Sequence, residues 1–146
     1  MMYIKELTSK EQMLTYLSVM QELYPELSAD YYAEMLDKML PHNYGQIAVF
    51  EGDQCLGISG YWLGTKLWCG SYLELDNVVV IEAARGTGAG KLLSTYLDQK
   101  AKDLGCYIMT LDAYSNNFKA HRFYYNQGYA PRGFHFIKIL EEDKLT

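Results

Sequence analysis

The N-terminal part of the chain is predicted to form a short strand followed by two helices. Apolar and polar residues alternate over Tyr3–Leu7, as in a strand with one buried face. Helical spacing of apolar residues follows, and the first helix begins after a capping pattern at Ser9 and ends before Pro25. Ser28 can cap a second helix, which must end before Pro41.

The middle of the chain is predicted to be β-structure. Two strands, at residues 46–50 and 54–63, flank a Gly-Asp pair that is typical of a tight turn. A long β-prone run follows at residues 67–81. Its alternation gives way to consecutive valines at residues 78–80, which predicts a strand that is buried on both faces there.

The C-terminal part is predicted to alternate helices with strands. A glycine-rich loop leads into a helix that ends at Gly105, and a strand follows at Cys106–Asp112. A short helix is expected over Asn116–Gly128 and a last strand over Phe134–Leu140. This order predicts one α/β (α+β) domain, residues 1–146, with a mixed sheet that has helices on both faces.

Composition narrows the possible partners. The chain has 146 residues, 49% of them hydrophobic, and a formal net charge of −5, which argues against nucleic acid and permits a cationic substrate. Three cysteines without C-x-x-C spacing fit neither a disulfide framework nor a zinc site, so we expect buried thiols and no metal. Without a signal-peptide pattern or a long apolar run, the expected location is cytoplasmic, with no membrane partner.

The stretch EAARGTGAGKLL, residues 82–93, has the chemistry of an anion-binding loop. It is not a P-loop, because Arg85 stands where that motif needs glycine and Leu92 where it needs a hydroxyl. The dinucleotide motif G-x-G-x-x-G fails as well, since Lys91 or Leu93 would have to be glycine. Unpaired amides and the positive end of a helix dipole would still hold a pyrophosphate. The alternative is a turn that only packs a helix against a strand.

Two motifs together resemble a known family. Arg85, Gly88 and Gly90 form R-x-x-G-x-G, and the stretch from Asn117 to Tyr129 has the form N-x-x-A-x-x-F-Y-x-x-x-G-Y. Both resemble the GNAT superfamily of acetyl-CoA-dependent N-acetyltransferases, and the order of the elements extends the resemblance to nearly the whole chain. It implies a mostly antiparallel central sheet with a splayed parallel pair of strands at the cofactor site.

The resemblance implies that acetyl-CoA is the co-substrate and assigns residues to it. The loop would bind its pyrophosphate through Arg85, Gly86, Thr87, Gly88, Ala89, Gly90 and Lys91. The backbone of Val78, Val79 and Val80 would bind the pantetheine arm in the manner of an added strand, and an amide near Val78 and Val79 would polarise the thioester carbonyl. Asn117 would bind the same arm, and Tyr124 would face the sulfur.

Acetyl transfer to an amine also needs an acid and a proton acceptor. Tyr124 is the expected acid for the leaving thiolate. Asp76, on the strand that borders the thioester, is the candidate base, with water as the alternative. Glu74 lies two residues earlier on the same strand face and is expected to attract a cationic amine, or else to be a solvated strand residue.

The acceptor pocket is expected to involve two further regions. Glu26 lies between the two predicted helices, Tyr31 lies in the second helix, and Trp68 lies in the β-prone run. Core packing of the two aromatic residues and helix-dipole compensation by Glu26 are nevertheless the favoured explanations. The expected reaction is N-acetylation of a primary amine on a small cationic molecule, by direct attack in a ternary complex. The alternatives are a protein lysine or N-terminus as acceptor, or a non-catalytic acyl-CoA-binding module. A homodimer is compatible with the resemblance.

Overall fold

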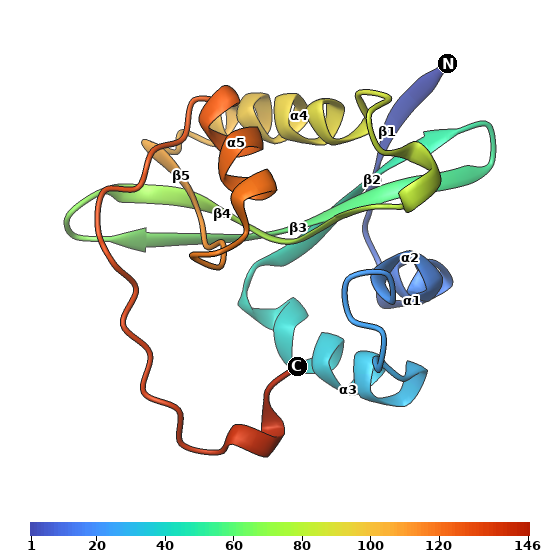
Figure 1. Cartoon of the computed structure of the whole chain (residues 1–146), viewed down its shortest axis with the longest axis horizontal. Coiled ribbons are helices and arrows are strands. Elements are labelled where there is room, and N and C mark those ends of the chain that lie inside the picture. Colours follow the sequence, from blue (N-terminus) through green and yellow to red (C-terminus); the bar gives the residue numbers. More distant parts are fainter. The chain divides into compact units, whose positions relative to one another are not determined.

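The computed structural model describes all 146 residues, which form two compact units, Met1–Leu111 and Asp112–Thr146. The first unit contains a five-stranded sheet in the order β1-β2-β3-β4-β5 (Figure 1). The strands are β1 (Met2–Leu7), β2 (Tyr44–Glu51), β3 (Gln54–Lys66), β4 (Gly70–Val80) and β5 (Ile108–Leu111). Neighbouring strands are antiparallel except β4 and β5, which are parallel. The predicted mixed, mostly antiparallel sheet is confirmed.

Helices cover both faces of this sheet, as predicted. The helices of the first unit are α1 (Lys10–Thr15), α2 (Leu17–Met20), α3 (Ala29–Met39) and α4 (Ala89–Asp103), with the 3-10 turns η1 (Leu40–His42) and η2 (Glu82–Ala84). Figure 1 shows α1, α2 and α3 on one side of the sheet and α4 on the other. The face that carries α4 is therefore separate from the face that meets the N-terminal helices.

Both predicted N-caps are present. The side chain of Ser9 accepts a hydrogen bond from the backbone of Gln12, and that of Ser28 accepts one from Tyr31. The first helical region ends at Met20, earlier than the expected stop before Pro25. The chain leaves helical geometry once within it, at Tyr16, whose ring meets the ring of Phe50 edge-on with centroids 5.3 Å apart.

The alternation of side chains along the strands divides the core into two layers. One buried cluster joins the N-terminal helices to the sheet and includes Met13, Met20, Leu36, Ala48, Phe50, Ile58 and Val79. Ile47 and Val49 alternate with residues of that cluster on β2, so they face α4, where Leu93 and Leu97 are buried. No helix of the chain is long and apolar enough to cross a membrane.

The three cysteines are free thiols, as the sequence predicts. Cys55 and Cys69 are buried, and Cys106 is half-buried. Burial raises the pKa of Cys55 to about 11, above its ordinary value.

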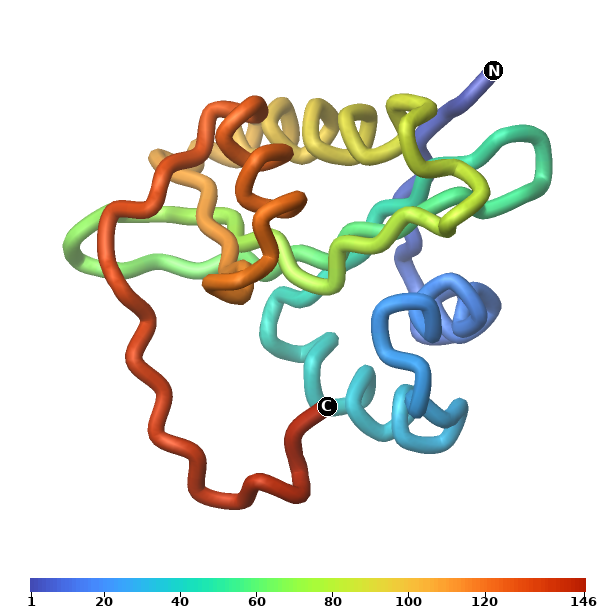
Figure 2. The backbone as a smooth tube through the Cα atoms, in the orientation of Figure 1, coloured from blue at the N-terminus to red at the C-terminus, as the bar shows by residue number.

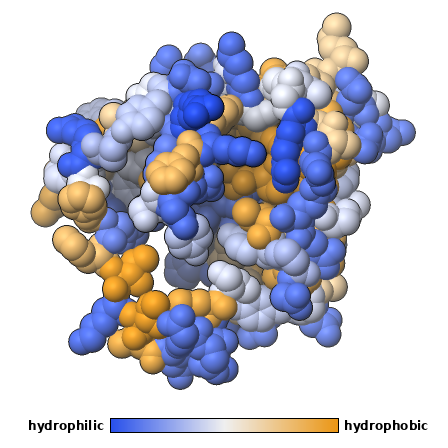
Figure 3. Space-filling view, viewed as in Figure 1, coloured by the Kyte–Doolittle hydropathy of each residue, from blue (hydrophilic) through white to orange (hydrophobic).

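The second unit contains the helix α5 (Phe118–Asn126) and the 3-10 turn η3 (Glu142–Lys144). The predicted strand over Phe134–Leu140 is wrong, because this segment pairs with no other strand and runs as the irregular tube that follows α5 in Figure 2. A strand needs a hydrogen-bonded neighbour, which sequence alternation alone does not supply. The side chains of Phe134 and Phe136 are consequently 89% and 90% exposed. On the face of the molecule drawn in Figure 3, orange apolar areas lie among blue polar ones.

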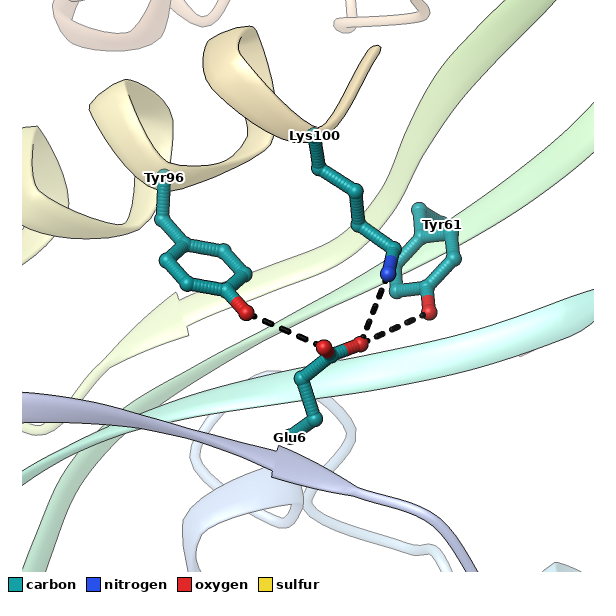
Figure 4. Close-up of polar contacts among 4 residues, drawn as sticks. All are labelled: Glu6, Tyr61, Tyr96 and Lys100. Carbon is teal, nitrogen blue, oxygen red and sulfur yellow. Dashed lines mark hydrogen bonds and ion pairs between the residues drawn. The ribbon is translucent and has the colours of Figure 1, made fainter. Parts of the chain in front are cut away.

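A polar cluster ties β1 to α4 (Figure 4). Lys100 Nζ lies 2.8 Å from Glu6 Oε1, and the hydroxyl of Tyr96 donates to Glu6 Oε2 at 3.0 Å. The hydroxyl of Tyr61 on β3 lies 3.5 Å from Glu6 Oε1. The hydrogen bond from Lys100 is the largest cause that lowers the pKa of Glu6 below its ordinary value of 4.5.

Substitution of this carboxylate should give a pH-dependent loss of stability. A lowered pKa in the folded state means that Glu6 stabilises the fold above pH 4.5 and loses this effect as the pH falls through the folded-state pKa. Glu6→Gln should therefore lower the free energy of unfolding by about 1 kcal/mol at pH 7. The difference from wild type should shrink below pH 4.5, as measured by urea denaturation. Glu26→Gln, at an exposed glutamate, is the control, and an equal effect of both variants would contradict the expectation.

Candidate active site

The glycine loop has the backbone geometry of an anion site. It lies between η2 and α4, and Gly86 and Gly88 have positive φ angles of +79° and +95°. Gly88 is the N-cap of α4 and makes no side-chain cap, so the first-turn amides of the helix have no side-chain acceptor. A Cβ atom added at either glycine would meet nothing within 4 Å, so the space beside these two residues is open.

The charges around this loop favour an anion. The first turn of α4 contains no acidic residue. Arg85 and Lys91 are both exposed at the loop and at the start of the helix. Together with the positive end of the helix dipole, they make a site that suits phosphate groups.

The parallel pair β4–β5 separates beside this loop. Pairing joins Tyr72–Leu75 to Ile108–Leu111 and stops there, while β4 continues to Val80. Within the first unit, the last five residues of β4 therefore have no strand on their β5 side. An extended ligand arm with amide groups can add to such an edge as a strand would.

A β-bulge interrupts β4 at the same place. Ile58 pairs with Val79 but Gly60 pairs with Asp76, so β4 contains one extra residue there. The prediction that the consecutive valines are buried on both faces is wrong, since only Val79 is buried and its two neighbours are half-buried. The valines alternate as in an ordinary strand, with Val79 in the core that meets the N-terminal helices, and the bulge changes the face that each following side chain occupies.

The candidate carboxylates lie on β4 just before the bulge. Asp76 Oδ2 accepts a hydrogen bond from the indole of Trp62 at 2.9 Å, and Asp76 Oδ1 accepts one from the backbone of Asn77 at 2.8 Å. Glu74 pairs with Trp62 across the sheet and is half-buried. Each oxygen of Asp76 has a further lone pair, so the carboxylate can still accept a hydrogen bond from an amine or a water molecule.

The second unit contains the other two residues assigned by the resemblance. Tyr124 lies on α5, where its ring packs edge-on against Phe123 and Tyr129 at centroid distances of 5.3 and 5.7 Å. Burial raises the pKa of the Tyr124 phenol above its ordinary value of 10. Asn117 is the N-cap of α5, and its Oδ1 accepts a hydrogen bond from the backbone of Ala120 at 3.2 Å.

The residues expected at the acceptor pocket are dispersed in the first unit. Glu26 is exposed in the segment between α2 and α3, and Tyr31 on α3 is 42% exposed. Trp68 is 71% exposed in the turn between β3 and β4. Val78 lies near the other end of β4. At the usual rise per residue of a strand, it is roughly 26 Å from the first residue of β4. The structure therefore does not bring Trp68 to the end of β4 where the bulge lies.

Sequence reasoning missed four residues around the bulge, namely Tyr24, Tyr44, Trp62 and Asn77. The hydroxyl of Tyr44 donates to Asn77 Oδ1 at 2.7 Å, and Asn77 Nδ2 donates to the hydroxyl of Tyr24 at 3.0 Å. The available signal was an Asp-Asn pair inside a β-prone run, because asparagine is unfavourable in strands but tolerates a positive φ.

Comparisons with known proteins agree with this geometry. The chain matches the model of the acetyltransferase (GNAT) family over residues 10–129. It is 28% identical over 125 residues to the uncharacterized N-acetyltransferase YhdJ of Bacillus subtilis (strain 168), which is 85% of this chain and 88% of that protein. It is 32% identical over 73 residues to the aminoalkylphosphonate N-acetyltransferase of Salmonella typhimurium, which is 50% of this chain and 46% of that protein.

The fold also matches a solved structure. The crystal structure of an aminoglycoside N-acetyltransferase in complex with CoA aligns with a TM-score of 0.79 at 16% identity, covering 94% of this chain and 95% of that one. With a family match over most of its length, the chain belongs to the GNAT acetyltransferase family. It is an acyl-CoA-dependent N-acyltransferase, and the predicted family and enzyme class are confirmed.

The glycine loop provides a test with an internal control. Gly88→Ala and Gly105→Ala both place a Cβ at a positive φ with nothing within 4 Å, at opposite ends of α4, so each should cost about 1–2 kcal/mol of stability. Only the Cβ at Gly88 would stand between a ligand and the first-turn amides. Gly88→Ala should therefore weaken CoA binding about tenfold more than Gly105→Ala does, as measured by calorimetry. Equal affinities would show that the loop is only a packing turn.

Proposed function

We propose that this protein transfers an acetyl group from acetyl-CoA to a primary amine of a small cationic molecule, by direct attack in a ternary complex. One observation carries the proposal: the end of β4 that β5 leaves unpaired is followed, after η2 and the glycine loop, by the N-terminus of α4, which has no side-chain cap. Acetyl-CoA has the matching form, with an amide-containing arm next to a pyrophosphate. No acidic side chain of the first turn of α4 opposes the anion there.

In this proposal the chain holds acetyl-CoA mainly through its backbone. The amides of residues 85–91 bind the pyrophosphate, and the charges of Arg85 and Lys91 add to the helix dipole. The backbone of Val78, Val79 and Val80 hydrogen-bonds the pantetheine arm on the side that β5 leaves free. Asn117, which caps α5 through Oδ1, retains the two N–H groups of its amide for the same arm.

The proposed reaction forms one bond and breaks another. The amine nitrogen attacks the carbonyl carbon of the thioester, and the carbon–sulfur bond breaks to give an amide and free CoA. A backbone N–H near Val78 and Val79 donates to the carbonyl oxygen, on which negative charge develops. Tyr124 gives its proton to the leaving sulfur, and the proton of the amine passes to Asp76 or to water.

The phenol of Tyr124 carries the proton that the proposed acid must donate. Burial disfavours the charged phenolate and raises the pKa of the phenol, so the group stays protonated throughout the neutral range. A phenol that keeps its proton can donate it to a thiolate.

The charge of the chain supports a small cationic acceptor. The net charge is −5, and Glu74 and Asp76 lie two residues apart on the same face of β4. The names of two similar proteins support a small amine as acceptor, since one names aminoalkylphosphonate and the other aminoglycosides, of which only the aminoglycosides are cationic overall. Glu26 and Tyr31 stay candidates for contacts with the acceptor, whereas Trp68 lies at the opposite end of β4 and is no longer one. A protein lysine or N-terminus is the alternative acceptor.

We also propose that the two units form one catalytic domain, residues 1–146. The family match supports this, because residues 10–129 cross the boundary at Asp112. The three free thiols support a reducing, cytoplasmic location.

Substitution of the proposed acid tests the chemistry. Tyr124→Phe should leave the affinity for CoA nearly unchanged and lower turnover roughly 10²- to 10⁴-fold, because only the proton donor is lost. The adjacent Tyr125→Phe is the control, since that side chain is 57% exposed and should keep full turnover. Thiol release with a panel of amines measures both variants, and unchanged turnover in Tyr124→Phe would remove this residue from the mechanism.

The proposed co-substrate is tested by parallel calorimetric titrations with acetyl-CoA, CoA and ATP with Mg²⁺. Acetyl-CoA and CoA should bind with micromolar affinity, and ATP should not bind, because Leu92 stands where a P-loop has its Mg²⁺-binding hydroxyl. If neither CoA species binds, the proposed function is wrong.

A further inference from the structure

The bulge in β4 has an unusual backbone. Asn77 has a φ of +52°, one of two positive values outside glycine in the chain. The register of the β3–β4 pairing shifts between Ile58 and Gly60 on β3. The backbone after Asn77 is therefore turned relative to the regular part of β4 before it. The direction of the N–H groups that follow therefore depends on how Asn77 is held.

A chain of donated hydrogen bonds holds the Asn77 side chain. Gln46 Nε2 donates to the Tyr44 hydroxyl at 3.1 Å, and Tyr44 donates to Asn77 Oδ1 at 2.7 Å. Asn77 Nδ2 then donates to the Tyr24 hydroxyl at 3.0 Å. Gln46 Nε2 also donates to Tyr32 on α3 at 2.7 Å. These bonds connect the bulge to β2, to α3 and to the segment between α2 and α3.

The neighbouring strand provides space for this arrangement. A Cβ atom added at Gly60 would lie 2.8 Å from Asn77 Oδ1 and would also collide with the Tyr44 hydroxyl. Glycine on β3 thus allows the two side chains to meet above the bulge. On the other side of Asn77, Asp76 accepts the hydrogen bonds from Trp62 and from the Asn77 backbone.

The hydrogen bonds of this chain are buried. Gln46 is fully buried, and Tyr44 is 6% exposed. Desolvation by burial raises the pKa of Tyr44 far above its ordinary value, so its hydroxyl keeps the proton that it donates to Asn77. Buried hydrogen bonds linked in a chain strengthen one another and are costly to leave unmade.

We propose that Asn77 is a positioning residue whose side chain, held by Tyr44 and Tyr24, aims the backbone N–H groups after the bulge at the thioester carbonyl. The proposal rests on the proposed function, because acetyl-CoA must lie along the end of β4. Four of the linked side chains come from outside β4, namely Gln46, Tyr44, Tyr24 and Tyr32. The hydrogen bonds therefore link the layer of N-terminal helices to the backbone N–H groups that are proposed to meet the thioester carbonyl.

The test compares three variants with one control. Asn77→Gly keeps the positive φ without strain and removes both side-chain bonds. Tyr44→Phe and Tyr24→Phe each remove one hydroxyl and keep the ring. Tyr3→Phe is the control, because it also removes one hydroxyl bond, to Gly52 O, but lies on β1 away from the bulge.

Two readouts separate positioning from a general loss of structure. Calorimetry measures the affinities for CoA and for acetyl-CoA, and infrared spectroscopy measures the carbonyl stretch of bound acetyl-CoA labelled with ¹³C at the carbonyl. The three variants should keep the CoA affinity within about twofold and lose about 3- to 10-fold in acetyl-CoA affinity. This is the range expected for weakening the one hydrogen bond from the backbone to the thioester carbonyl. Their carbonyl band should return toward its value in water, and Tyr3→Phe should match wild type.

The possible outcomes are distinguishable. An unchanged carbonyl band and acetyl-CoA affinity in the folded variants would overturn the positioning role while leaving the proposed function intact. An equal loss of CoA and acetyl-CoA affinity would show that the bonds only support the fold. If Asn77→Gly fails to fold, the two Tyr→Phe variants decide the question. Failure of the wild type to bind acetyl-CoA would overturn the proposed function and this inference together.

Discussion

The first unit depends on a change of partners along β4. Up to Leu75 this strand lies between β3 and β5, and beyond Leu75 only β3 continues beside it. Backbone N–H and C=O groups need partners, which the strand finds on both sides in its first part and on one side in its second. The same strand is therefore a fixed central element of the sheet and a binding edge, and the bulge marks the boundary between the two parts.

Glycines on β3 make this boundary possible. Gly57 and Gly60 face the last part of β4, and a Cβ at Gly57 would lie 2.7 Å from Val79 O. A side chain at either position would push β4 away or displace the groups that hold Asn77. The binding edge thus depends as much on the strand behind it as on its own sequence, although β3 itself provides no group for the proposed chemistry.

The sequence predicted the features that are determined by local chemistry. Ser9 and Ser28 were predicted as caps because a hydroxyl next to free amides is sufficient, and the glycine loop was predicted because its spacing and the helix after it lie within one short stretch. The bulge and its hydrogen bonds were not predictable, since Tyr24, Tyr44 and Asn77 meet only through the tertiary fold. The strand expected over Phe134–Leu140 was wrong for the same reason, because pairing requires a neighbour that local alternation cannot specify.

The buried thiols have a practical consequence for following the reaction. With a pKa of about 11, Cys55 is ionised in only about one molecule in a thousand at pH 8, whereas an ordinary thiol with a pKa near 8.5 is ionised to about a quarter. Electrophilic thiol reagents react with the thiolate form, and both Cys55 and Cys69 are also shielded by burial. Such reagents will therefore report the CoA that is released with little signal from these two protein thiols, so turnover can be recorded continuously.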